Sequence, residues 1–120
     1  MIITPFTPLS IDDRGYTATY NHLRSGEHII VFRKAGTVSG RHYHKGTAAT
    51  KAPELFLLLS GSLMLNWHHI ESAELNSIMV SGPSLIEIPP LVWHELLMQT
   101  DCTALELGSL KDHREDTYYL

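Results

Sequence analysis

The sequence predicts an all-β protein, a sandwich or barrel of about eight to ten short strands. Apolar residues alternate with their neighbours where Leu63, Leu65 and Trp67 stand, which is the two-residue period of a strand. Strand-sized apolar runs recur along the chain, and glycine- or proline-containing turn signals separate them. No segment shows a sustained 3.6-residue apolar repeat with a capping residue in front of it, so the pattern favours strands over helices.

The expected strands follow one another at close spacing. The main runs are HIIVF (28–32), ELFLLL (54–59), SLIEI (84–88), WHELLM (93–98) and TALEL (103–107). The turn signals between them stand at 25–26, 35–36, 60–61, 81–83 and 89–90. Residues 69–76 can form a helical turn, but we expect a loop between strands. A further strand segment is expected within residues 1–27, and a tail at 109–120.

The run at 54–59 is apolar on both of its faces. Leu55 and every second residue after it face one side, while Phe56 and Leu58 face the other. Both sides must therefore be covered. A second subunit is a common cover in small β proteins, so we expect a homodimer. The alternative is that the N-terminal segment folds over that face.

Composition excludes several classes of protein. The 120 residues are 43% hydrophobic and 18% charged, which suits a single packed domain rather than a disordered tail. The formal net charge of −4 indicates no basic face, so neither nucleic acid nor an anionic membrane is an expected partner. Cys102 is the only cysteine, which excludes an internal disulfide and a four-thiolate zinc site. The N-terminus lacks the pattern of a secretory signal and no apolar run approaches the ~18 residues of a membrane span, so we expect a cytoplasmic protein.

The eight histidines of the chain suggest a metal site. His42 and His44 are two residues apart, so in an extended segment both imidazoles point to the same side, ~6–7 Å apart at the backbone. His94 follows a stiff Pro-Pro turn that delivers it onto a strand. Glu54 is a carboxylate on the buried face of a strand, where it needs a partner. Three imidazoles and one carboxylate suit manganese, iron, nickel or zinc.

At these residues the sequence resembles the cupin family. The first cupin motif reads Gly, five residues, His-x-His, a short gap, Glu, six residues, Gly; its matches here are Gly36, His42, His44, Glu54 and Gly61. Nine residues (KGTAATKAP, 45–53) fill the gap where the family has three or four, which indicates a lengthened loop. The second motif is matched by Gly82, Pro89 and His94, with Leu91 in place of the usual glycine.

The resemblance covers about residues 28–108 of a single cupin domain, 1–120. It implies a jelly-roll β-barrel, the double-stranded β-helix, with the four candidate ligands pointing into its mouth. A finer resemblance, carried by DDRGY (12–16), RHYHK (41–45), IPPLVWHEL (88–96) and the tyrosine-rich end, links the chain to the dTDP-4-keto-6-deoxyhexose ketoisomerases and epimerases. Those cupins often work without a metal, use a histidine of the His-x-His region as acid/base, and carry Gln where this chain has Glu54. Glu54 therefore favours the metal-binding pattern.

We predict a metal-binding cupin that acts on a small polar molecule, a sugar or sugar-acid isomerase or epimerase. The predicted metal ligands are His42, His44, Glu54 and His94. The ion would stabilise the developing enolate charge as a Lewis acid, and Glu87 or Glu106 would move the proton. Candidate contacts to the substrate are Arg41 and Lys45, which flank the histidine pair and suit a carboxylate or phosphate, and Trp93.

Other interpretations stay open. One is a metal-free dTDP-sugar ketoisomerase with His42 or His44 as acid/base, and another is a ligand-binding or sensor module without turnover. Glu54 can instead form a salt bridge to Arg41 or Lys51, and the three histidines can be structural. The remaining histidines are expected to be ordinary: His68 and His69 point to opposite faces of a strand, and three have no partner at a useful spacing, namely His22, His28 and His113.

Overall fold

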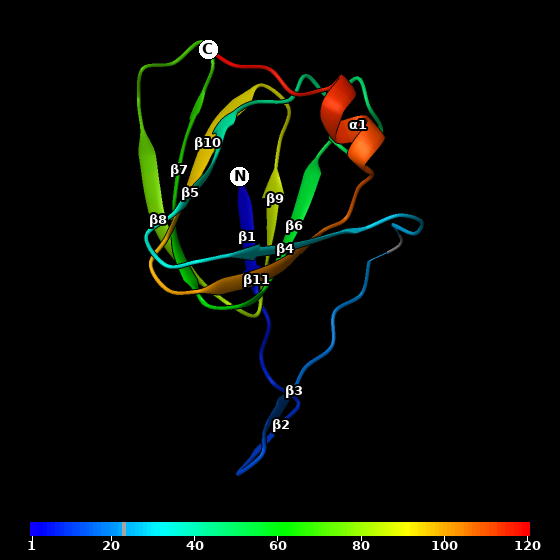
Figure 1. Cartoon of the computed structure of the whole chain (residues 1–120), viewed down its shortest axis with the longest axis vertical. Coiled ribbons are helices and arrows are strands. Elements are labelled where there is room, and N and C mark those ends of the chain that lie inside the picture. Colours follow the sequence, from blue (N-terminus) through cyan, green and yellow to red (C-terminus); the bar gives the residue numbers. More distant parts are fainter. Residues whose placement is uncertain (23) are drawn as a thin grey trace.

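The computed structural model describes residues 1–22 and 24–120. Two antiparallel sheets curve into a jelly-roll barrel (Figure 1). The five-stranded sheet has the order β1-β9-β6-β11-β4 and the four-stranded sheet the order β5-β10-β7-β8. Their bounds are β1 Ile2–Pro5, β4 Ile29–Arg33, β5 Val38–His42, β6 Glu54–Ser60, β7 Ser62–His69, β8 Asn76–Ser81, β9 Ser84–Ile88, β10 Val92–Met98 and β11 Cys102–Glu106. The predicted all-β fold is confirmed, and the run predicted at 84–88 coincides with β9.

The main core lies between the two sheets. Alternate side chains of each strand point inward, so the two-residue period seen in the sequence gives each strand one face toward this core. Leu58, Leu63, Leu65 and Ile86 are completely buried there, and Val31, Phe56, Val80, Ile88, Leu96, Met98, Cys102 and Ala104 complete this core. This packing fixes the strands from which the candidate ligands project.

Strand β6 is buried on both faces, as its sequence predicts. Leu55 and Leu57 turn away from the main core and form a second cluster with Leu85 and Leu107, against which Phe6 packs. The N-terminal segment therefore covers part of this face, as in the alternative to a subunit contact, while Leu59 at the end of the strand stays exposed. The homodimer stays a prediction.

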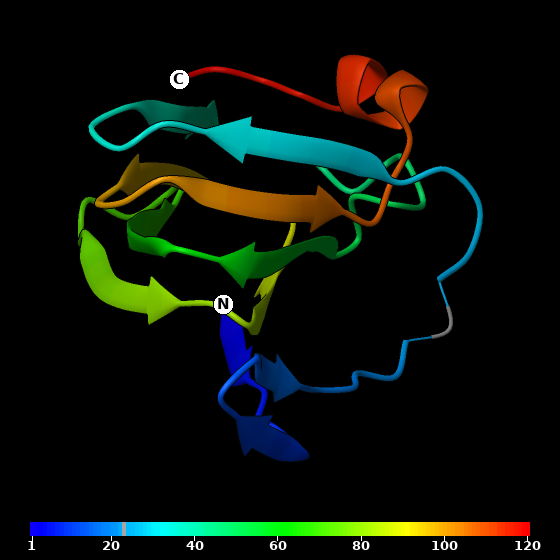
Figure 2. The same cartoon turned by 60° about the horizontal axis from the view of Figure 1, so that its bottom comes forward.

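Segments outside the barrel extend in two directions. The hairpin of β2 (Ser10–Asp12) and β3 (Gly15–Thr17) projects away from the barrel, whereas the helix α1 (Leu110–Glu115) lies over the opposite end (Figures 1 and 2). The expected C-terminal tail thus contains a helix, whose first turn is capped by the Ser109 hydroxyl accepting from the Asp112 N–H. In the described part of the chain, no helix is long and apolar enough to span a membrane.

Candidate functional site

Four of the predicted site residues meet inside one end of the barrel. His42 ends β5, His44 follows it, Glu54 begins β6, and His94 lies in β10 directly opposite His42. Each offers one ligand atom, and these four atoms lie within 4.8 Å of one another. His44 and His94 are each 1% exposed and Glu54 is 4% exposed. The long gap before Glu54 does not displace it from the cluster.

A bulge in β5 turns His42 into the barrel. The pairing of β10 with β5 advances from His94–His42 to Glu95–Gly40, so Arg41 is the extra residue. Gly40 and Arg41 both have positive φ, 87° and 61°. A Cβ on Gly40 would stand 2.8 Å from the carbonyl oxygen of His94, so glycine is required where the two strands approach. Arg41 itself points out and pairs with Glu95 at 3.0 Å.

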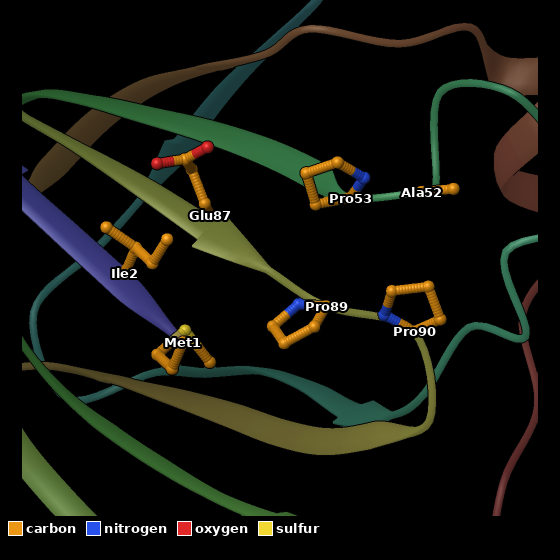
Figure 3. Close-up of a pocket in the computed structure, with 7 residues that line it drawn as sticks. All are labelled: Met1, Ile2, Ala52, Pro53, Glu87, Pro89 and Pro90. Atoms are coloured by element: carbon orange, nitrogen blue, oxygen red, sulfur yellow. The ribbon is translucent and has the colours of Figure 1, made fainter.

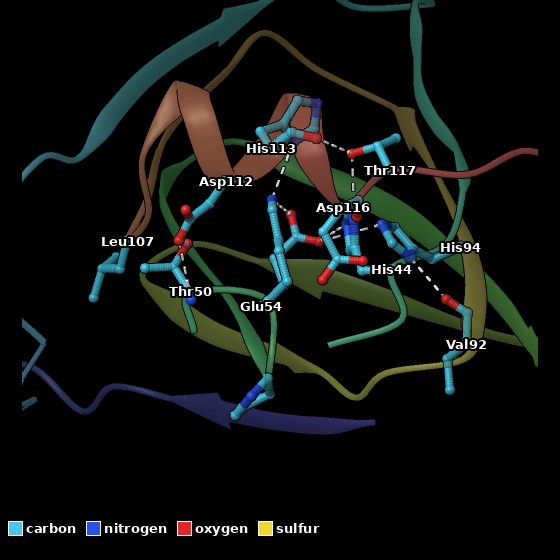
Figure 4. A network of polar contacts seen from close by, with 12 residues as sticks. His44, Thr50, Glu54, Val92, His94, Leu107, Asp112, His113, Asp116 and Thr117 are labelled. Carbon is cyan, nitrogen blue, oxygen red and sulfur yellow. Dashed lines mark hydrogen bonds and ion pairs between the residues drawn. The ribbon is translucent and has the colours of Figure 1, made fainter. Parts of the chain in front are cut away.

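Hydrogen bonds to the backbone set the orientation of the two most buried imidazoles. Nδ1 of His44 donates to the carbonyl of Asp116 at 2.7 Å, and Nδ1 of His94 donates to the carbonyl of Val92 at 3.0 Å (Figure 4). With Nδ1 engaged in this way, Nε2 is the nitrogen of each ring that faces Glu54. Second partners of this kind are the usual support of metal-ligating histidines.

Nε2 of His44 and Oε2 of Glu54 face each other as a buried pair without a hydrogen-bond partner. Nε2 of His94 lies 3.6 Å from the same oxygen. Lone pairs that face one another this closely repel unless a cation joins them. A proton on His44 is one such cation and a metal ion at the centre of the four residues is the other. The donor set therefore fits a divalent transition metal.

The electrostatics of the cluster also favour a cation. Burial, reinforced by His94 and His44, lowers the pKa of His42 to about 3, and burial lowers the pKa of His94 as well. Burial alone would raise the pKa of Glu54, but the adjacent His44, His94 and Lys51 outweigh it and lower that pKa. The site thus holds the neutral imidazoles of His42 and His94 beside an ionised carboxylate.

Two further residues, Lys51 and His113, lie beside the cluster. Nζ of Lys51 lies 3.7 Å from Oε1 of Glu54 and 3.0 Å from Nδ1 of His113. The expectation that His113 has no useful partner is therefore wrong: its ring centroid lies 5.6 Å from that of His42 and 5.9 Å from that of His44. The salt-bridge alternative for Glu54 holds for Lys51 but not for Arg41. The only sequence signal for a place of His113 in the site is the count of eight histidines.

Glu106 lies beside the cluster and Glu87 does not. Glu106 lines a small cavity inside the barrel together with His42, Glu54 and His94. Burial, followed by the charge of Glu54, raises the pKa of Glu106. Glu87 lies on the outer face of the five-stranded sheet and lines a different pocket of about 360 Å³ whose walls are Met1, Ile2, Ala52, Pro53, Pro89 and Pro90 (Figure 3).

The predicted substrate contacts lie outside the cluster. The amine of Lys45 lies over the ring of Tyr118, 4.1 Å from its centroid, and the indole of Trp93 stacks on His68 at 5.2 Å. Arg41 is paired to Glu95. None of Arg41, Lys45 and Trp93 therefore lines the barrel cavity or points into it.

The C-terminal tail closes the end of the barrel over the cluster. The Asp116 carboxylate accepts from the backbone N–H groups of Lys45 and Ala48, and Tyr43 and Tyr118 exchange two backbone hydrogen bonds of 2.9 Å. The ring of Tyr119 lies 6.1 Å from that of His42. The interior cavity measures about 40 Å³, which is room for a few water-sized groups.

Comparison with solved structures places this fold among known proteins. The chain is similar to the capsular polysaccharide assembling protein CapF from Staphylococcus aureus, with 25% identity over 97% of this chain and a TM-score of 0.63. It spans 34% of the CapF chain. It is also similar to the QdtA 3,4-ketoisomerase from Thermoanaerobacterium thermosaccharolyticum in complex with TDP, with 20% identity, 99% of this chain and 86% of that chain covered, and a TM-score of 0.73.

A third similar structure is the dTDP-6-deoxy-D-glucose-3,5-epimerase RmlC from Legionella pneumophila, with 15% identity, a TM-score of 0.69, and 98% of this chain and 71% of that chain covered. No protein-family model and no curated protein matches the sequence. The topology of the two sheets and these structural likenesses agree on the fold. The chain therefore has the jelly-roll fold of the RmlC-like cupins.

Proposed function

We propose that the chain is a metal-binding cupin that isomerises or epimerises a sugar or a sugar acid. One observation carries the proposal: four ligand atoms converge within 4.8 Å, and hydrogen bonds at Nδ1 orient the buried rings of His44 and His94 so that Nε2 faces inward. Such a donor set, buried and without a full complement of partners, suits a divalent cation. The structural likeness to sugar 3,4-ketoisomerase and 3,5-epimerase structures supports the sugar class.

In this proposal the four cluster residues hold the ion, which supplies Lewis-acid stabilisation of negative charge on a substrate oxygen. Glu106 is the preferred proton carrier, because it lines the cavity and its raised pKa makes it a stronger base than an ordinary carboxylate. Arg33 and Ser39 line the same cavity and provide hydrogen-bond donors for hydroxyl groups. Glu87 takes no part, since it lies on the other side of the sheet.

Metal analysis tests the proposal directly. Protein purified without chelators, and a sample reloaded with manganese, iron(II), nickel or zinc, is expected to hold about one ion per chain and to melt at a higher temperature than chelator-treated protein. His94→Asn should abolish this ion, whereas His68→Asn, which changes a histidine outside the cluster, should retain it. A reloaded wild-type protein without a stoichiometric metal ion would rule out the proposal.

A metal-free dTDP-sugar ketoisomerase is the second candidate. The close His44–Glu54 pair, which a proton can join, favours it, and so does the likeness to a ketoisomerase structure that contains TDP. This candidate predicts that dTDP raises the melting temperature and that metals do not. A ligand-binding module without turnover remains the third candidate, for which binding is seen but no sugar is converted.

A further inference from the structure

Lys51 stands out among the groups that the proposed reaction does not use. Its side chain is 2% exposed, and a buried ammonium is costly unless it is paired. Its two partners are Oε1 of Glu54 at 3.7 Å and Nδ1 of His113 at 3.0 Å. Because lysine only donates, Nδ1 of His113 must be the acceptor. The ammonium is thus enclosed between a carboxylate and a neutral imidazole.

The lengthened loop between His44 and Glu54 is the element that brings Lys51 into this position. The C-terminal segment holds the loop down at two points: the Asp116 carboxylate accepts from Ala48 N–H at 3.0 Å, and the Thr50 hydroxyl donates to Asp112 at 2.8 Å. The extra residues of the loop therefore have a structural consequence, which is a cation buried against the cluster carboxylate.

Glu54 presents its two oxygens to different partners. Oε2 faces the imidazoles of His44 and His94, and Oε1 faces Lys51. A carboxylate with one oxygen engaged by an ammonium has only the other free for a metal ion. Monodentate ligation leaves more of the coordination sphere open, which a substrate oxygen needs.

We propose that Lys51 is a positioning residue that engages Oε1 of Glu54, limits this carboxylate to a single ligand atom, and weakens the site's hold on a divalent cation through its own positive charge. The inference rests on the proposed metal site. It concerns the geometry and the affinity of that site, whereas the proposed function concerns its existence.

The test is cobalt(II) titration of the chelator-treated full chain, followed by visible absorption spectroscopy and calorimetry. Lys51→Met removes the charge and frees Oε1. Cobalt is then expected to bind roughly tenfold tighter or more, because like charges a few ångströms apart repel strongly in a partly buried site. The d–d bands should weaken as the coordination number rises. Lys51→Gln, which keeps a donor without the charge, should also bind cobalt more tightly while changing the bands less.

Lys45→Met is the matched control, since it removes a charge from the same loop at a residue that lies over Tyr118 rather than in the cluster. It should leave the affinity and the spectrum unchanged. Weaker cobalt binding in both Lys51 variants, with folded circular dichroism spectra, would show a merely structural role and overturn the inference. Unchanged affinity and bands would overturn it too, while the metal site would stand. Absence of cobalt binding in the wild type would overturn both proposals.

Discussion

Replacing Gly40 with alanine probes how the fold builds the cluster. Gly40 occupies the bulge that turns His42 inward, at φ 87°, and an added Cβ would stand 2.8 Å from the carbonyl oxygen of His94. That oxygen belongs to backbone in the middle of β10 and cannot move freely. The alanine must therefore displace one of the two strands that carry His42 and His94.

The cost can be worked from two contributions. A left-handed φ costs a residue with a side chain about 1–2 kcal/mol, offset by about 0.4–1 kcal/mol because alanine restricts the unfolded chain. Overlap in a packed region adds about 1–3 kcal/mol. Gly40→Ala is expected to lower the free energy of unfolding by about 1–4.5 kcal/mol in total, with a midpoint of about 3 kcal/mol. Gly36→Ala, at φ 82° with open space around the new Cβ, has only the first contribution and should cost about 1 kcal/mol.

Urea unfolding followed by tryptophan fluorescence measures both losses, and calorimetry with zinc measures what happens to the site. Gly40→Ala should also weaken zinc binding by at least roughly tenfold, because metal affinity depends on the placement of each ligand, whereas Gly36→Ala should not. Equal stability losses in the two variants, or a Gly40→Ala protein that binds zinc as the wild type does, would refute the role given to the bulge.

Three further predictions follow from single features. In metal-free protein the free energy of unfolding should fall as the pH drops from about 6.5 toward about 3. The pKa of His42 is about 3 in the folded state and 6.5 ordinarily, so unfolding takes up a proton in that window. His42→Asn should flatten this dependence in urea titrations at several pH values, and an unchanged slope would contradict the prediction. Asp116→Ala should cost about 2–4 kcal/mol by the same assay, since it leaves the N–H groups of Lys45 and Ala48 without an acceptor, and a loss under about 1 kcal/mol counts against that role. Light scattering after gel filtration should give twice the mass of one chain. Ile30 is 79% exposed on the edge strand β4, and the Ile30→Arg variant should give the mass of a single chain. A wild-type monomer would contradict the predicted dimer.

The strands and the cluster could be predicted because both correspond to regular patterns in the sequence. Alternation identifies the buried face of β7 through Leu63 and Leu65, and burial of both faces of β6 follows from its unbroken apolar run. The ligands follow from spacing, since an i, i+2 pair on an extended segment places His42 and His44 on one side. Convergence with His94 then needed the resemblance to a known motif, because nothing local links two strands about fifty residues apart.

Lys51 was open to prediction only as a possible ion-pair partner of Glu54, and neither its burial nor its contact with His113 follows from a sequence pattern. Lys51 and His113 are brought together across 62 positions of the chain, and a lysine in a loop ordinarily indicates solvent exposure. The helix α1 has six residues and no buried side chain, so it carries no periodic signal that could be read. Both features depend on the C-terminal segment folding back over the barrel, which is a tertiary contact rather than a local preference.

The metal-binding and metal-free interpretations differ in what joins Nε2 of His44 to Oε2 of Glu54, and they also differ in the size of the ligand that must reach the cluster. A metal ion fits the 40 Å³ cavity as it stands. A sugar already exceeds that volume, and a dTDP-sugar has many times it. For the larger ligand we expect the tail to release its backbone bonds to Tyr43 and the contact between Asp116 and His44. Release of that contact also removes the acceptor that holds the His44 ring, so nucleotide binding would change the same imidazole that a metal ion requires to stay fixed. Ligation of a metal by His44 and occupancy by a nucleotide-sized ligand are therefore expected to oppose each other in this chain.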